Sequence, residues 1–346
     1  MKLAIKIILG LLFVLLLVAL LGPRSKFEKV DPNLPDINVP LDQLDTHILL
    51  KEKLVDGLKD DNESRIVWND STKQQTKYCL LYLHGFSASA MEGDPLHTEF
   101  AKRYGMNLYL PRLEDHGRES INSFEHLTPK AYMDSAKDAL RIASLLGEHV
   151  IIMGCSTGGT LGAYLAANEP QLVKGLMLYS PNIDLYDTNS RMFTWPWGKQ
   201  MLKQVVGGDY YTVDYSGSDG AKYWNPKYHI NGLIALKSLI NQTMTTETFK
   251  KINQPTLICS FYKDEEVHDK VVSHDAMRQF YDEISTDSDY KEYIQFPDVV
   301  GHVFTSYIFS EDYKKALKVS IDFAEDKLGL RSKESIISDM LTQEVF

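Results

Sequence analysis

Short apolar runs and amphipathic segments alternate along most of this chain. Apolar runs of about four to eight residues indicate buried strands, whereas an apolar residue every third or fourth position indicates a helix. Strands are expected at residues 65–68, 78–85, 106–113, 149–154, 173–181, 255–262 and 290–297. Helices are expected at residues 41–58, 91–105, 128–147, 269–284 and 310–328, and another is expected to begin at about residue 157. Alternating strands and helices predict an α/β fold with a mainly parallel sheet covered on both faces.

One segment interrupts this alternation. Residues 183–245 are rich in tryptophan and tyrosine. Residues 198–206 and 233–242 are compatible with helices, while 207–220 are expected to be a loop. An aromatic insertion between two strands predicts a cap over a pocket, although the same rings can form a small core of their own.

The N-terminus carries a long apolar run. Residues 7–21 have no polar interruption, and about 20 apolar residues are enough to cross a bilayer. We expect residues 1–22 to be an uncleaved signal anchor, with a cleaved signal peptide as the alternative. The Pro-containing residues 23–40 are expected to be a stem, followed by one domain at 41–346 outside the cytoplasm. If the segment is cleaved, the protein is secreted or periplasmic.

Charge and cysteine content narrow the function classes. The formal charge is −10 over 346 residues, which argues against nucleic-acid binding because phosphate contacts need clustered Lys and Arg. Cys79, Cys155 and Cys259 are far apart, in neither a disulfide framework nor a zinc-binding pattern. We expect three reduced, buried thiols and neither a metal nor an organic cofactor.

Gly154-Cys155-Ser156-Thr157-Gly158 matches the pattern G-x-S-x-G. The pattern alone is common, but here it joins the end of an expected strand to the start of an expected helix. In that setting a sharp strand–turn–helix bend exposes a nucleophilic serine. The alternative is that the glycines only allow close helix packing.

A serine hydroxyl needs a base to remove its proton. His302 follows Gly301 after the last expected strand, which makes it the best-placed histidine. The base needs a carboxylate to orient it, and we prefer Asp264 because it comes first after the strand at 255–262. The competing carboxylates are those of Glu265, Glu266, Asp269 and, with less support, Asp298.

The oxyanion of an acyl-transfer reaction needs hydrogen-bond donors. His84-Gly85-Phe86 ends an early strand, and its turn can direct the Phe86 backbone N–H toward the substrate. The Thr157 N–H at the helix start would be the second donor.

The motifs HGF, GCSTGG, KDEEV and GHVF, in this order, resemble the α/β-hydrolase superfamily. Within it the chain looks like the monoacylglycerol lipase, carboxylesterase and serine aminopeptidase-like branch. The resemblance covers about residues 60–330 and implies a Ser156, Asp264 and His302 triad. In the stretch PRLEDHGRES, Asp115 stands where that branch usually has glycine, which puts the local turn in doubt.

The resulting expectation is a serine hydrolase that cleaves carboxylic esters of small or lipid-like molecules through an acyl-enzyme. A peptidase, amidase or thioesterase would use the same residues. A membrane-anchored binding protein without catalysis is the rival from another class.

Overall fold

The computed structural model describes residues 2–299 and 301–343, with a seven-stranded sheet at its centre. The strand order is β1-β3-β2-β4-β5-β8-β9. β1 runs antiparallel to β3, and all other neighbours in this sheet are parallel. The strands are β1 (Arg65–Val67), β2 (Thr76–Leu83), β3 (Asn107–Leu110), β4 (Gly147–Cys155), β5 (Val173–Tyr179), β8 (Thr256–Phe261) and β9 (Lys291–Phe296). Every strand expected from the apolar runs is present.

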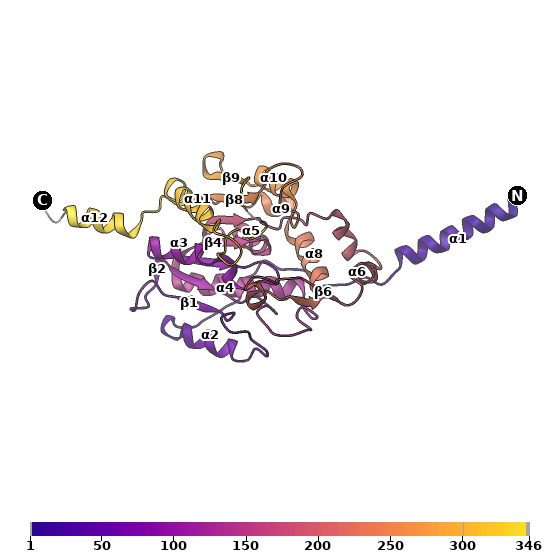
Figure 1. The fold of residues 1–346 in the computed structure, drawn as a ribbon, viewed down its shortest axis with the longest axis horizontal. Coiled ribbons are helices and arrows are strands. Elements are labelled where there is room, and N and C mark those ends of the chain that lie inside the picture. The colour runs from indigo at the N-terminus through magenta and orange to yellow at the C-terminus, as the bar shows by residue number, and fades with distance from the viewer. Residues whose placement is uncertain (1, 300, 344–346) are drawn as a thin grey trace.

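Helices cover both faces of the sheet (Figure 1). One face packs against α4 (Pro129–Leu146), α5 (Thr157–Asn168), α9 (Thr246–Phe249) and α10 (His274–Glu283). The other packs against α3 (Leu96–Tyr104) and α11 (Tyr313–Asp326). Outside these two layers are α2 (Leu44–Glu52) and the C-terminal α12 (Lys333–Gln343), which projects from the main body (Figure 1). The helix expected at 91–105 is divided into η2 (Ala90–Gly93) and α3, with Pro95 between them.

Alternate side chains of the central strands enter the two apolar cores. On β2, Leu81 and Leu83 belong to the core beneath α4 and α5, whereas Leu80 and Tyr82 belong to the core beneath α3 and α11. A strand exposes successive side chains to opposite faces, so a strand buried on both sides is apolar at nearly every position. This accounts for the continuous apolar runs in the sequence.

The 183–245 segment lies between β5 and β8 and has its own small elements. They are η3 (Thr188–Thr194), α6 (Gly198–Val206), β6 (Tyr210–Thr212), α7 (Gly220–Tyr223), β7 (Lys227–His229) and α8 (Asn231–Thr243). The expectation of a loop at 207–220 is wrong in part, because β6 pairs with β7 in an antiparallel ribbon. β7 lies outside the expected loop, so the sequence pattern within residues 207–220 does not reveal that β6 has a pairing partner.

The N-terminal helix α1 (Lys2–Leu20) is long and apolar enough to cross a membrane, with a mean hydropathy of 3.0. None of its residues is buried against the rest of the chain. In Figure 1 it projects from the side of the molecule that carries α6 and α8, away from α12. A signal sequence has the same length and composition.

Residues 23–40 contain no helix or strand and run along the surface of the main body. The Val30 amide donates to Gln242 Oε1 on α8 at 2.9 Å. The Lys137 ammonium on α4 lies 3.4 Å from Asp31 Oδ1. Phe27, Val30 and Leu34 pack against the core beside α4 and α8. The segment is therefore held at several points along its length.

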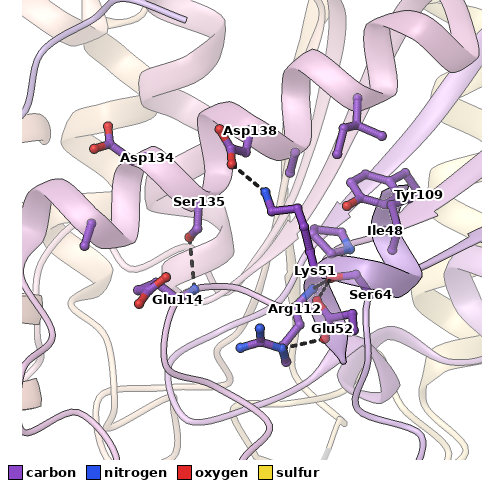
Figure 2. Close-up of a pocket in the computed structure, with 14 residues that line it drawn as sticks. Ile48, Lys51, Glu52, Ser64, Tyr109, Arg112, Glu114, Asp134, Ser135 and Asp138 are labelled. Atoms are coloured by element: carbon purple, nitrogen blue, oxygen red, sulfur yellow. Dashed lines mark hydrogen bonds and ion pairs between the residues drawn. The ribbon is translucent and has the colours of Figure 1, made fainter. Parts of the chain in front are cut away.

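A polar hollow of about 370 Å³ separates α2 from α4 (Figure 2). Arg112 Nε donates to Glu52 Oε2 at 2.8 Å, and the Ser64 hydroxyl donates to Glu52 Oε1 at 2.8 Å. Lys51 on α2 pairs with Asp138 on α4 at 3.0 Å. These contacts fasten α2 to α4 and to the loops before β1 and after β3. The hollow shares no lining residue with the cavity described next.

Candidate active site

Ser156 occupies a strained turn between β4 and α5. Its backbone has φ 52° and ψ −118°, a left-handed conformation that costs energy for any residue other than glycine. The turn is held by the Ser156 amide, which donates to Tyr179 O at 2.9 Å, and by the Asn182 amide, which donates to Ser156 O at 2.9 Å. The predicted strand–turn–helix setting is thus present.

The glycines that flank Ser156 are required by close backbone contacts. A Cβ on Gly158 would lie 1.8 Å from Leu83 O, and a Cβ on Gly154 would lie 2.6 Å from the backbone of Gly158. The positive φ falls on Ser156 itself. A Cβ on Gly159 would lie 2.7 Å from Pro181 Cβ, so this glycine lets α5 pack against the chain after β5.

His302 and Ser156 line one cavity of about 540 Å³. Its wall is mostly aromatic and aliphatic, and many of the side chains come from the 183–245 segment. The cavity is lined in part by Phe86, Phe193, Val205, Tyr211, Tyr215, Trp224, Tyr228, Val271 and Phe309. His302 Nε2 is buried, and no hydrogen-bond partner for it is found among the described residues.

The carboxylate that contacts His302 belongs to Asp269. Its Oδ2 lies 2.6 Å from His302 Nδ1, and the residue is 2% exposed. The expectation that Asp264 orients His302 is therefore wrong. Asp264 is exposed, and its Oδ1 accepts the amides of Glu266 at 2.9 Å and Val267 at 2.8 Å.

The loop after β8 explains this difference. It folds back on itself, with the Lys263 amide donating to Val267 O at 3.0 Å and the Asp269 amide donating to Phe261 O at 3.1 Å. Asp269 therefore returns to the end of the strand, although it is eight residues beyond Phe261 in the sequence. Asp264 lies at the turn of this loop.

The electrostatics of the pair favour an ionised carboxylate. Burial raises the pKa of Asp269, but the neighbouring His302 and the Val271 amide outweigh burial and hold that pKa below its ordinary value. Burial lowers the pKa of His302, yet Asp269 and, to a smaller extent, Glu92 raise it above its ordinary value. With Asp269 accepting at Nδ1, the neutral ring presents Nε2 as a proton acceptor.

The Gly85–Phe86 peptide is also held in place. His84 lies with Nδ1 2.9 Å from Gly85 O, and the Leu113 amide donates to His84 Nε2 at 3.2 Å. Burial lowers the pKa of His84 to about 4, so the ring is neutral near pH 7. Because Nε2 accepts, Nδ1 carries the proton and donates to the Gly85 carbonyl.

Phe86 and Thr157 both line the cavity. Thr157 is the first residue of α5, where a backbone amide has no carbonyl partner within the helix. Their roles as oxyanion donors remain a prediction. The doubtful turn at Asp115 does form, with φ 60°, and the carboxylate of Asp115 accepts from Arg118 Nη1 and the Phe124 amide.

Sequence reasoning missed a further acidic residue in this cavity. Glu92 on η2 is 1% exposed and accepts the Gly85 amide at 2.7 Å through Oε2. It stands among small and apolar residues in the stretch SASAMEG, which carries no recognised motif. Only its place beside the HGF turn in three dimensions relates it to the site.

Comparison with known proteins agrees with this fold. No family model matches the chain. A curated relative, the thermostable monoacylglycerol lipase of Bacillus sp. (strain H-257), is 28% identical over 106 residues, which is 31% of this chain and 41% of that protein. The chain therefore matches less than half the length of this relative.

Solved structures cover far more of the chain. A structure of the metagenome-derived lipolytic enzymes LipS and LipT is similar with a TM-score of 0.62 and 18% identity, over 77% of this chain and 98% of that one. The monoacylglycerol lipase of Paleococcus ferrophilus has a TM-score of 0.54 and 14% identity, over 75% and 98%. Est1E from Butyrivibrio proteoclasticus, bound to ferulic acid, has a TM-score of 0.52 and 15% identity, over 77% and 95%. The chain has the α/β-hydrolase fold.

Proposed function

We propose that this protein is a serine hydrolase of carboxylic esters, with Ser156 as nucleophile, His302 as base and Asp269 as the orienting carboxylate. The observation that carries the proposal is that His302, which contacts Asp269, lines the same largely apolar cavity as Ser156. The strained Ser156 backbone adds support, because such strain concentrates at functional sites.

The reaction proceeds by acyl transfer. His302 Nε2 takes the hydroxyl proton of Ser156 as Oγ attacks the ester carbonyl carbon. The amides of Phe86 and Thr157 stabilise the oxyanion of the tetrahedral intermediate. His302 then gives the proton to the leaving alcohol. Water attacks the acyl-enzyme with His302 again as base, which releases the carboxylic acid and restores Ser156.

The cavity favours an ester with an apolar part. Aromatic rings from the HGF turn and the 183–245 segment form much of its wall, and burial of apolar substrate surface provides binding energy. The 183–245 segment thus acts as the cap of the pocket. Monoacylglycerols and medium-chain esters combine an accessible ester group with an apolar acyl chain. They are therefore the preferred substrate class.

A fluorophosphonate probe and a substrate series test the proposal. The full chain in detergent should be labelled by the probe, and Ser156→Ala should lose both labelling and ester hydrolysis. Ser144→Ala is the matched control, since Ser144 lies on α4 and its hydroxyl donates to Arg141 O at 2.7 Å outside the cavity. Full activity of Ser156→Ala would refute the mechanism. Faster turnover of amino-acid arylamides or thioesters than of oxygen esters would assign the site to a peptidase, amidase or thioesterase.

We also propose that α1 stays attached as a membrane anchor, with the hydrolase domain outside the cytoplasm. Support comes from contacts between the end of α1 and the 183–245 segment. Trp197 Nε1 donates to Val18 O at 2.9 Å, and the Trp197 amide donates to Pro23 O at 2.8 Å. Tryptophan is enriched at membrane–water interfaces, where an apolar ring and a polar N–H are both accommodated.

This arrangement would place the cavity close to the bilayer. α6 follows Trp197 directly, and its Val205 lines the cavity while remaining 84% exposed. A lipid-like ester would then have a short path from the membrane. Alkaline extraction of membranes, together with the N-terminal mass of the mature protein, tests the anchor. Release of a chain lacking residues 1–22 would support the secreted or periplasmic alternative.

A further inference from the structure

Glu92 is a buried acid at the junction of two catalytic loops. Its side chain lines the cavity with Ser156 and His302. Oε2 accepts the Gly85 amide at 2.7 Å and the Tyr82 hydroxyl at 3.3 Å. A carboxyl group seldom lies inside a protein without a specific partner. Here one of its partners is the backbone of the HGF turn.

Glu92 and His84 hold Gly85 from both ends. Glu92 binds the amide of Gly85, while His84 Nδ1 donates to its carbonyl at 2.9 Å. That carbonyl belongs to the same planar peptide as the Phe86 N–H, so fixing one orients the other. A Cβ placed on Gly85 would lie 2.7 Å from Glu92 Oε1 and 3.0 Å from Ser156 Cβ. The acid and the nucleophile therefore flank the same side of Gly85.

The backbone around Glu92 also fastens the loop that carries His302. The Thr305 hydroxyl donates to Glu92 O at 2.7 Å, and the Ser306 hydroxyl donates to Met91 O at 2.8 Å. The short helix η2 is thus bound to the HGF turn on one side and to the chain after His302 on the other.

We propose that Glu92 is a positioning residue, which fixes the oxyanion peptide through Gly85 and whose negative charge favours the protonated form of His302 during acyl transfer. The proposal rests on the ester-hydrolase function given above. His302 becomes positively charged when it takes the proton of Ser156, so a nearby anion stabilises that state.

The titration of the surrounding groups supports this role. Burial raises the pKa of Glu92 to about 7, an effect that the Gly85 amide and His302 partly offset. The other ionisable groups that interact with it include Tyr82 on β2, Cys155 on β4, Tyr132 on α4 and Tyr215 in the 183–245 segment. Burial raises the pKa of all four, so they are neutral near pH 7. The negative charge that acts on His302 therefore comes from Asp269 and, above about pH 7, from Glu92.

The test is the pH profile of kcat/KM for p-nitrophenyl butyrate, measured on the full chain in detergent micelles. Glu92→Gln keeps an acceptor for the Gly85 amide but removes the charge. The acid limb of its profile should move to lower pH by less than about 1 unit, because His302 loses the smaller of its two anionic influences. Glu92→Leu also removes the acceptor, and its kcat should fall at least about tenfold below that of Glu92→Gln.

Glu52→Gln is the matched control, since Glu52 is a buried acid outside the cavity. Its acid limb should coincide with that of the wild type. An unshifted acid limb in Glu92→Gln would overturn the proposal, and so would equal kcat in folded Glu92→Leu and the wild type. If Glu92→Leu does not fold, the Glu92→Gln profile alone decides. Ser156→Ala separates the two ideas: if it is inactive while the Glu92 variants behave as wild type, only the role of Glu92 is refuted.

Discussion

Replacement of Asp269 by Asn tests the assignment of the orienting carboxylate. Asp269 Oδ2 lies 2.6 Å from His302 Nδ1 and keeps the ring proton on that nitrogen. An Asn side chain can present its NH₂ group there, which makes Nδ1 an acceptor and leaves the proton on Nε2. The ring then cannot accept the proton of Ser156. Loss of kcat by about 10⁴-fold is expected for such a change, equivalent to about 5.5 kcal/mol of barrier.

Asp264→Asn provides the control within the same loop. Asn keeps the side-chain oxygen that accepts the Glu266 and Val267 amides. Activity should stay within about twofold of the wild type, as for most exposed substitutions. The assay is hydrolysis of p-nitrophenyl esters near pH 8, with circular dichroism to confirm folding. A larger loss in Asp264→Asn than in Asp269→Asn would refute the assignment.

Three further predictions concern the pH profile and the fold. In the wild type, kcat/KM should fall as the pH drops through the pKa of His302. The midpoint should lie above the ordinary value for histidine because Asp269 raises that pKa. A midpoint below about pH 6.5 would contradict this. Gly158→Ala should yield insoluble or unfolded protein, because the new Cβ would lie 1.8 Å from a backbone oxygen. Gly208→Ala is the control and should give the wild-type yield of soluble protein, because its Cβ would have no neighbour within 4 Å. Lys59→Met should lower the free energy of unfolding, measured in urea, by about 2 kcal/mol. The reason is that Lys59 Nζ donates to the carbonyls of Ala221 at 2.8 Å and Trp224 at 3.0 Å. An unchanged unfolding midpoint would refute a stabilising role for these two hydrogen bonds.

The strand pattern was readable from the sequence because its signal is local. Runs such as residues 149–154 are apolar at nearly every position, since both faces of the sheet are covered. Thr128 and Pro129 likewise mark the start of α4, where the Thr128 hydroxyl accepts the Ala131 amide at 3.1 Å. The ribbon of β6 and β7 was missed because each strand has only three residues and its partner lies beyond the expected loop.

The candidate site also has a part that local sequence signals predict and a part that they do not. The positions of Ser156 at a sharp turn and of His302 after the last strand were predictable, because each has a neighbouring glycine and follows a strand. The choice among the acids after β8 was not predictable, because a fold in the loop brings Asp269 rather than Asp264 back to Phe261. Counting residues from the end of a strand assumes an extended path, and this loop does not follow one.

Glu92 is the clearest case of a residue that only the tertiary structure relates to the site. Its sequence neighbours are small and apolar, and its importance comes from a hydrogen bond to Gly85 and from the cavity that it shares with His302. The sequence by itself determined the alternating elements, the apolar N-terminal helix and the sharp turn at Ser156, because periodicity and glycine placement act over a few residues. The tertiary structure decided which acid contacts His302 and which buried carboxyl group shares the cavity of Ser156, because those contacts depend on how distant loops fold back on the sheet.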